Sequence, residues 1–332
     1  MDADRENNAA GNGDKILNYS FVYGPVPSRR LGRSLGINNI PPKICSYSCV
    51  YCQLGKTKNI QTERRKYYNP EELVAAVKKR LGELKKRGEP LDYLAFVPDG
   101  EPTLDANLGI EIDLLKTTGV KIAVITNASL LRRKELQDEL KKADWVSLKV
   151  DAFTPEVWQD INRPCKGLEL DAILDGILEF SQSFEGELTT ETMLVKGIND
   201  DMEEVDKISS FISELTPSIS YLSTPTRPPA QKIEAVNQET IDSAYTNFRN
   251  KINSVECLTG YEGNTFSSTG IASEDLLSIT AVHPMREDAV LELLGQLNAE
   301  WAIVEKLIGE GKLIEREYGD KKFYSRKLPG TS

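Results

Sequence analysis

Three cysteines lie within eight residues, in the segment Cys45-Ser46-Tyr47-Ser48-Cys49-Val50-Tyr51-Cys52. Thiols this close together are typical of metal binding. Iron–sulfur clusters are held by cysteine sulfur, so three thiolates can bind three irons of a four-iron cube. The fourth iron then lacks a cysteine ligand, and a reacting molecule binds at an open position of a metal centre. The spacing therefore predicts a catalytic [4Fe–4S] cluster held by Cys45, Cys49 and Cys52.

A zinc knuckle is the main alternative, but a structural zinc site needs a fourth ligand. His283 is the single histidine and lies far toward the C-terminus, while Cys165 and Cys257 have no cysteine near them. A disulfide is disfavoured because no signal peptide is readable, which indicates a reducing compartment. The aromatic Tyr51 directly before the last cysteine of the segment adds to the iron–sulfur interpretation.

The pattern C-x-x-x-C-x-aromatic-C resembles the signature of the radical S-adenosylmethionine (SAM) superfamily. The resemblance implies that the open iron is chelated by the amino and carboxylate groups of SAM. It also implies reductive cleavage of SAM to methionine and a 5′-deoxyadenosyl radical, which abstracts hydrogen from a substrate. A low-potential electron donor, such as ferredoxin or flavodoxin, is then an expected partner. The protein itself must bind and orient the cluster, SAM and the substrate, and must exclude water from them.

Strands and helices alternate along most of the chain. Alternation of this kind predicts a parallel sheet with helices outside it, and barrels of this class carry reactive residues at the C-terminal ends of their strands. The predicted fold class is α/β, a partial (β/α)6 TIM-like barrel of the radical SAM kind. Strands are expected at 34–38, 93–98, 120–126, 145–150, 188–195 and 219–223, and helices at 70–87, 108–116, 133–142, 170–184 and 201–215.

The domain organisation follows from the ends of this alternation. Residues 1–17 contain few apolar side chains that could be buried and are expected to be disordered. The barrel is expected at 18–230, a connecting segment at 231–272 and a winged-helix-like domain at 273–328. A short strand is expected at 19–23 and a turn at 24–28. In the connecting segment a helix is expected at 238–252. The last domain is expected to hold helices at 274–280, 286–297 and 300–310, with strands at 312–317 and 321–327.

The first strand-end motif is Asp99-Gly100-Glu101-Pro102-Thr103. It resembles the Gly-Gly-Glu motif of the superfamily, with Asp99 in place of the first glycine. The resemblance implies that Gly100, Glu101 and Thr103 belong to the SAM site and that this loop receives the SAM amino group.

Polar residues also end the next strands. Thr126 and Asn127 are expected to reach the SAM ribose or carboxylate. The resemblance implies that Ser147 or Asp151 binds the ribose, although Asp151 could instead cap a helix that begins near Pro155. It also gives Glu191 as a later SAM contact.

Five further side chains near strand ends are candidates for catalysis. Lys149 and Lys196 could act as charge partners or, with a lowered pKa, as Schiff-base amines. Arg163 and Arg227 could together bind a carboxylate or phosphate. Cys165 could donate hydrogen or ligate a second centre, although a lone thiol is more often a packed residue.

Charge is distributed unevenly along the chain. The net charge is −10, but residues 29–66 hold nine Lys or Arg and one acid, Glu63, so this basic collar carries +8. The collar either balances the cluster and SAM or faces an acidic substrate such as RNA. No apolar run approaches the ~20 residues of a membrane span, and a soluble cytoplasmic protein is expected. DNA is disfavoured as a partner because the last predicted helix carries Glu300, Glu305 and Glu310 against Lys306.

Several short motifs, taken together, carry a finer resemblance: residues 25–30, the cysteine segment, 100–103, 162–164 and 227–229. They resemble Fe–S oxidoreductases related to wyosine synthases, which modify guanosine in transfer RNA (tRNA). Wyosine synthases add a second cysteine triplet before the barrel, and residues 1–44 here contain no cysteine. A tRNA base, a peptide and a small metabolite therefore all stay open as substrates, and a redox-sensing regulator or metal-binding adaptor is the alternative from another class.

Overall fold

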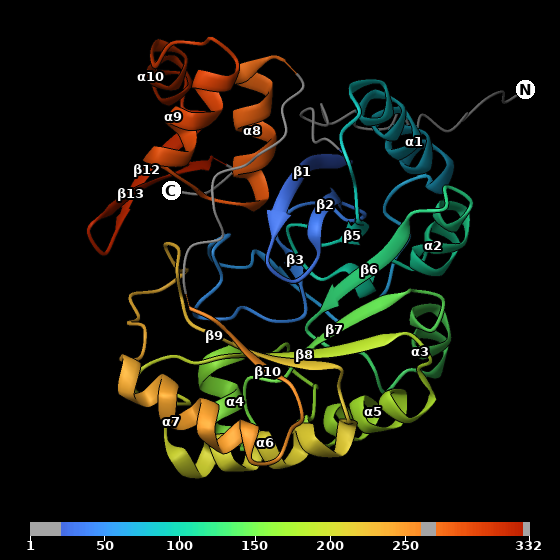
Figure 1. Ribbon diagram of the computed structural model, residues 1–332. Coiled ribbons are helices and arrows are strands. Elements are labelled where there is room, and N and C mark those ends of the chain that lie inside the picture. Colours follow the sequence, from blue (N-terminus) through green and yellow to red (C-terminus); the bar gives the residue numbers. More distant parts are fainter. Residues whose placement is uncertain (1–20, 260–269, 328–332) are drawn as a thin grey trace, which may run out of the picture.

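The computed structural model describes residues 21–259 and 270–327, and its centre is an eight-stranded sheet. β1 is antiparallel to β2, and every later pair of neighbours is parallel. The sheet curves into an open half-barrel (Figure 1). In spatial order its strands are β1 (Val22–Ser28), β2 (Gly32–Ile37), β5 (Tyr93–Phe96), β6 (Lys121–Thr126), β7 (Trp145–Lys149), β8 (Glu187–Met193), β9 (Ile219–Ser223) and β10 (Val255–Leu258).

Helices separate the parallel strands and lie around the outside of the curved sheet (Figure 1). This arrangement confirms the predicted α/β partial barrel. The helices are α1 (Pro70–Arg87), α2 (Leu108–Lys116), α3 (Lys134–Leu140), α4 (Pro155–Asn162), α5 (Leu170–Ser183), α6 (Met202–Leu215) and α7 (Gln238–Arg249). Three short elements lie in the loops: β3 (Ile44–Cys45), β4 (Asn59–Ile60) and the 3-10 turn η1 (Pro102–Leu104).

Helix α1 shows how local sequence fixes an element. The Asn69 side chain accepts a hydrogen bond from Glu72 N at 3.0 Å, and Pro70 occupies the first helical turn. Gly88 ends the helix with a φ of 66°, a backbone conformation that glycine adopts without steric cost. Leu73 and Val77 on one face are fully buried against the sheet core. The predicted helix 70–87 is therefore confirmed.

The predicted turn at 24–28 is wrong, because these residues belong to β1. Gly24, Pro25 and Pro27 read as turn residues, but β1 is an edge strand, where a proline without an N–H is tolerated. The register of the β1–β2 pair shifts between Tyr23 and Val26, so the strand bends at this point. Of the strand expected at 19–23, residues 19–20 lie outside the described residues, as does the segment 1–17.

The sheet has seven parallel strands, one more than the six predicted. β10 pairs in parallel with β9 and lies beyond residue 230, where the barrel was expected to end. Its four residues are too few for a periodic signal that would show a further strand of the sheet. Cys257 lies in this strand and is half-buried.

The C-terminal residues form a second cluster of helices with a small antiparallel sheet in the order β11-β13-β12. The three expected helices and the hairpin are present, whereas β11 was not predicted; the winged-helix designation stays a prediction. Helix α8 packs against β1 of the half-barrel. The elements are α8 (Ala272–Val282), β11 (Met285–Arg286), α9 (Glu287–Gln296), α10 (Ala302–Gly309), β12 (Leu313–Tyr318) and β13 (Lys321–Arg326). Among the described residues, none of the helices has the length and apolar character needed to cross a membrane.

Candidate active site

The cysteine loop follows β2 and is fastened at several points to loops that follow other strands. Gly100 pairs with Ile44 in a parallel bridge, and a Cβ at Gly100 would collide with the Ile44 carbonyl oxygen. Glycine is therefore required for this close approach. On the other side, Cys165 N donates to Ser46 O at 2.8 Å and Gln231 N donates to Val50 O at 3.1 Å. These contacts within the protein hold the backbone of the loop.

The three cysteines of this loop line one cavity of about 300 Å³. The last residue of each of five neighbouring strands also lines it: Thr126 of β6, Lys149 of β7, Met193 of β8, Ser223 of β9 and Leu258 of β10. The cavity therefore lies at the carboxyl edge of the sheet, where ligands of parallel α/β folds bind.

Two of the thiols accept hydrogen bonds from asparagine amides. Asn127 Nδ2 lies 3.6 Å from Cys45 Sγ, and Asn162 Nδ2 lies 3.4 Å from Cys49 Sγ. Burial raises the pKa of all three thiols, to about 12 for Cys49. A bound cation would offset this cost, because thiolates that coordinate a metal are deprotonated outright.

The donor set fits an iron–sulfur cube. Three sulfurs face one cavity, and N–H groups point at two of them, which is the kind of contact that tunes such clusters. Within 21–259 and 270–327, no group of three or more His, Cys, Asp or Glu converges on a position for a single metal ion. A cube places different demands on the protein, because each thiolate binds a different iron.

Glu101 lies in the loop after β5 and contacts the first of these strand ends, Thr126 of β6. Its Oε1 accepts hydrogen bonds from Thr103 N at 3.1 Å, Thr103 Oγ1 at 2.6 Å and Thr126 Oγ1 at 2.6 Å, and its Oε2 accepts from Asn127 N at 2.8 Å. The side chain is buried, and burial raises its pKa despite these donors. Glu101 thus ties the loop after β5 to the end of β6, a structural role beside the predicted one in SAM binding.

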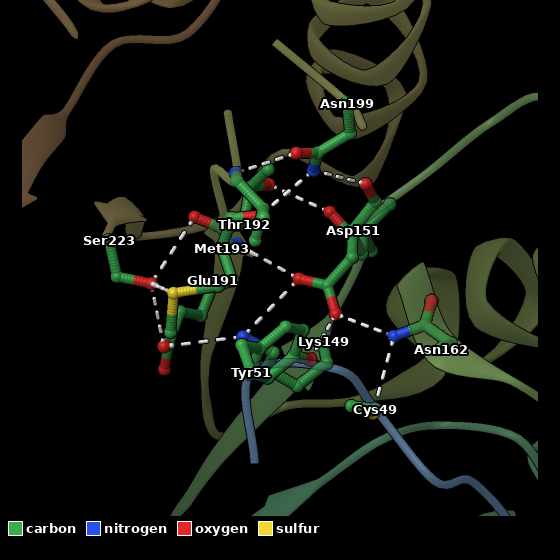
Figure 2. Close-up of polar contacts among 12 residues, drawn as sticks. Cys49, Tyr51, Lys149, Asp151, Asn162, Glu191, Thr192, Met193, Asn199 and Ser223 are labelled. Atoms are coloured by element: carbon green, nitrogen blue, oxygen red, sulfur yellow. Dashed lines mark hydrogen bonds and ion pairs between the residues drawn. The ribbon is translucent and has the colours of Figure 1, made fainter. Parts of the chain in front are cut away.

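A second polar network joins β7, β8 and the cysteine loop (Figure 2). Lys149 Nζ lies 3.3 Å from Asp151 Oδ1 and 3.3 Å from Glu191 Oε1. Tyr51 donates a short hydrogen bond to Asp151 Oδ2, which also accepts from Asn162 Nδ2 at 2.9 Å. One carboxylate therefore orients both the aromatic residue of the cysteine motif and the amide that contacts Cys49.

The charged side chains of this network stabilise one another in their ionised forms. Burial acts to raise the pKa of Glu191, but Lys149 and Arg30 outweigh it and hold the pKa at about 2. Burial acts to lower the pKa of Lys149, but Asp151 and Glu191 outweigh it and raise the pKa. A Schiff-base amine needs the opposite shift, so the surroundings of Lys149 favour the charge-partner interpretation.

The structure brings many of the predicted site residues together but not all. Asp151, Ser147 and Thr103 are buried behind the wall, and the Ser147 hydroxyl has no hydrogen-bond partner among the described residues. The predicted residues on the cavity wall, besides the three cysteines, are Tyr51, Gly100, Glu101, Thr126, Asn127, Lys149, Glu191 and Arg227.

Three of the catalytic candidates lie away from this wall. Arg163 is exposed at the C-terminal end of α4, and Lys196 is exposed and paired with Glu234 at 2.7 Å. Cys165 is half-buried and contacts the cysteine loop through its backbone. Arg227 does line the cavity, where its guanidinium lies 3.1 Å from Gln53 Oε1 and 2.9 Å from His283 Nε2. His283 thereby contacts a residue of the cavity wall.

Sequence reasoning missed three polar residues of the site. Arg30 lines the cavity and pairs with Glu191, and Ser223 donates to the same carboxylate at 3.0 Å. Asn162 contacts Cys49. Arg30 and Asn162 stand in motifs that the sequence analysis singled out, but nothing local indicated their partners.

The basic collar is partly neutralised by the fold. Among the described residues, at least four of its nine cations pair with acids from outside residues 29–66, and these pairs offset four of the eight net positive charges. These pairs are Arg30 with Glu191, Arg33 with Glu89, Lys43 with Asp99 and Arg64 with Glu139.

The half-barrel carries three cysteines in the loop after its first parallel strand, at the carboxyl edge of the sheet. The family model described as the radical SAM superfamily matches residues 39–208, half of the chain. The chain belongs to this superfamily and is an enzyme.

Two relatives match along nearly their whole length. The UPF0026 protein of Methanocaldococcus jannaschii is 46% identical over 312 residues, which cover 93% of this chain and 97% of the relative. The UPF0026 protein of Helicobacter pylori strain J99 is 30% identical over 310 residues, 92% of this chain and 98% of the relative.

Solved structures of low sequence identity share the fold. A radical SAM methyltransferase from Sphaerobacter thermophilus superposes with a TM-score of 0.52 at 15% identity, over 68% of this chain and 66% of that one. A structure of TYW1 with a lysine–pyruvate adduct bound has a TM-score of 0.50 at 19% identity, over 66% of this chain and 74% of that one.

Proposed function

We propose that this enzyme binds one [4Fe–4S] cluster through Cys45, Cys49 and Cys52 and binds SAM beside it in the cavity at the carboxyl edge of the sheet. The observation that carries the proposal is that three thiols and the ends of five parallel strands line a single cavity. The cavity volume of about 300 Å³ is at the lower end of the range for small-molecule sites.

The residues of the cavity wall would have different roles in binding the cluster and SAM. The amides of Asn127 and Asn162 stabilise negative charge on two of the sulfurs, because N–H donors favour the thiolate form. Glu101 and the backbone beside it would receive the SAM amino group, and Glu191 and Asn127 would contact the rest of SAM. When bound and reduced, the cluster supplies the electron that cleaves SAM to methionine and the 5′-deoxyadenosyl radical. The low-potential electron would come from a donor such as ferredoxin or flavodoxin.

The test is anaerobic reconstitution with iron and sulfide, followed by reduction with dithionite in the presence of SAM. We expect about four irons per chain and release of 5′-deoxyadenosine. Alanine at any one of the three cluster cysteines should abolish both. An iron content near eight per chain would contradict a single cluster, and zinc in place of iron would contradict the function.

We further propose a tRNA base as the candidate substrate to test first. The fold shared with TYW1 and the finer motif resemblance to wyosine synthases favour it, whereas the partial neutralisation of the collar weakens the argument from charge. Exposed lysines of the collar, Lys56, Lys58 and Lys66, are then the expected phosphate contacts.

Binding of bulk tRNA to the reconstituted enzyme should weaken steeply as salt rises, because each neutralised phosphate releases counterions. Replacing Lys56, Lys58 and Lys66 by alanine should make this salt dependence shallower. Absence of binding at low salt, with the cluster present, would favour a peptide or small metabolite. Mass spectrometry of molecules that copurify under anaerobic conditions would then identify the class of substrate.

A further inference from the structure

A buried ion pair lies beneath the cysteine loop. Lys43 precedes Cys45 by two residues; its side chain is 4% exposed, and that of Asp99 is fully buried. Lys43 Nζ lies 3.7 Å from Asp99 Oδ1, which is too long for a hydrogen bond. Within the described part of the chain, neither the ammonium nor either carboxylate oxygen has a hydrogen-bond partner. The ammonium therefore has donors to spare in a place shielded from water.

The ammonium lies against the end of the loop that carries Cys52. A Cβ at Gly55 would have Lys43 Nζ as its nearest neighbour at 3.8 Å, and Gly55 N donates to Cys52 O at 3.0 Å. The ammonium therefore lies beside the backbone turn that carries Cys52, with the Asp99 carboxylate as its ion-pair partner.

Two features show that the arrangement is costly to keep. A buried charge without hydrogen bonds is destabilising, and a buried ion pair can often be replaced by apolar residues without loss of stability. Lys43 also has a φ of 66°, in the left-handed region that few residues other than glycine adopt. Two backbone hydrogen bonds hold it there: Lys43 N donates to Asp99 O at 2.7 Å, and Asn59 N donates to Lys43 O at 3.1 Å.

We propose that Lys43 is a positioning residue that holds a positive charge against the Cys52 side of the cluster and raises its reduction potential, with Asp99 limiting this effect. The inference rests on the proposed function, because it requires a cluster bound through Cys52. A three-thiolate cluster gains a negative charge on reduction, and net charge and hydrogen bonds to sulfur set its potential. A nearby ammonium therefore stabilises the reduced form more than the oxidised form.

The experiment is a redox titration of the reconstituted full chain without SAM, followed by electron paramagnetic resonance of the reduced cluster. Lys43→Met should lower the reduction potential relative to wild type, and Asp99→Asn should raise it because the ammonium is then uncompensated. Lys43→Arg keeps the charge and serves as the matched control, with a potential close to that of wild type. The double variant Lys43→Met/Asp99→Asn removes the pair without leaving an isolated buried charge, and its potential should be lower than that of Asp99→Asn.

The outcomes separate the two proposals. If wild-type protein takes up no iron and sulfide, the proposed function fails. If the cluster forms and all variants share the wild-type potential, or if Lys43→Met raises it, the role of Lys43 is refuted. Should Lys43→Met alone fail to fold or to load iron, the comparison between the double variant and Asp99→Asn decides, since equal potentials there refute the inference as well.

Discussion

Replacement of Glu101 by alanine should destabilise the fold as well as impair SAM binding. The buried carboxylate accepts four hydrogen bonds, two from backbone N–H groups and two from threonine hydroxyls. The hydroxyls can turn to other acceptors, but the N–H groups of Thr103 and Asn127 cannot. Each unsatisfied buried donor costs about 1–3 kcal/mol, and removal of a buried carboxylate returns part of this. We expect the free energy of unfolding to fall by about 3 kcal/mol in Glu101→Ala.

Glu101→Gln distinguishes the structural role from the loss of charge. Glutamine retains an oxygen for the three donors on Oε1 but places an NH₂ group opposite Asn127 N. Its loss of stability should be about 1–2 kcal/mol, in the lower part of the range of about 1–3 kcal/mol for one buried N–H group left without an acceptor. Urea unfolding of the apoprotein, read from the transition of the half-barrel, measures both losses.

The control is Glu135→Ala on α3, whose side chain is 62% exposed and which should change the stability by no more than about 0.5 kcal/mol. The reasoning is refuted if Glu101→Ala unfolds at the same urea concentration as this control. In that event the carboxylate would serve ligand binding alone. Calorimetry with SAM, on variants shown to retain iron, then measures the effect on the cofactor separately.

Further expectations concern the thiols and the charged network. Serine at Cys165 or Cys257 should leave the iron content unchanged, because neither thiol lines the cavity of the cluster cysteines; a loss of iron would assign that thiol to the cluster. Lys149→Met should cost about 3–5 kcal/mol in urea unfolding, since it leaves the buried Asp151 without its cation while Glu191 keeps Arg30. Lys149→Arg should cost clearly less, and equal losses would argue against a charge effect. Glu191 has a folded pKa of about 2, below its ordinary 4.5, so it stabilises the protein above pH 5. Its contribution, on the order of 3 kcal/mol, should disappear as the pH falls toward 2. The stability difference between wild type and Glu191→Gln should therefore shrink with acid, and a constant difference would contradict the pKa.

The local sequence was sufficient to predict most of the strands and helices of the half-barrel. The cap at Asn69 and the glycine at position 88 delimit α1 through contacts within a few residues, and the sequence shows them directly. The predicted turn at 24–28 failed because edge position, which tolerates proline, is a property of the assembled sheet. The addition of β10 to the sheet also depends on its neighbour β9 rather than on its own four residues.

The sequence was sufficient to predict the cluster ligands of the candidate site, but not the contacts between its residues. The cysteines and the polar residues at strand ends can be recognised from their residue types and spacing. Arg30 and Glu191, however, are separated by 161 positions, and Tyr51 and Asp151 by 100. No local pattern reports such pairs, because they depend on which strand ends the curvature of the sheet brings together.

These long-range pairs change the interpretation of the positive charge around the cysteine loop. From the sequence alone, the collar either balances the cluster and SAM or faces an acidic substrate. In the fold, Glu191 meets both Arg30 and Lys149, and Asp99 meets Lys43, so several of the charges nearest the cavity are already paired. Pairs of this kind hold their charges in fixed positions, whereas exposed lysines remain screened by solvent. The buried part of the collar is thus suited to orient a cofactor, and recognition of a large anionic substrate would fall to the exposed lysines.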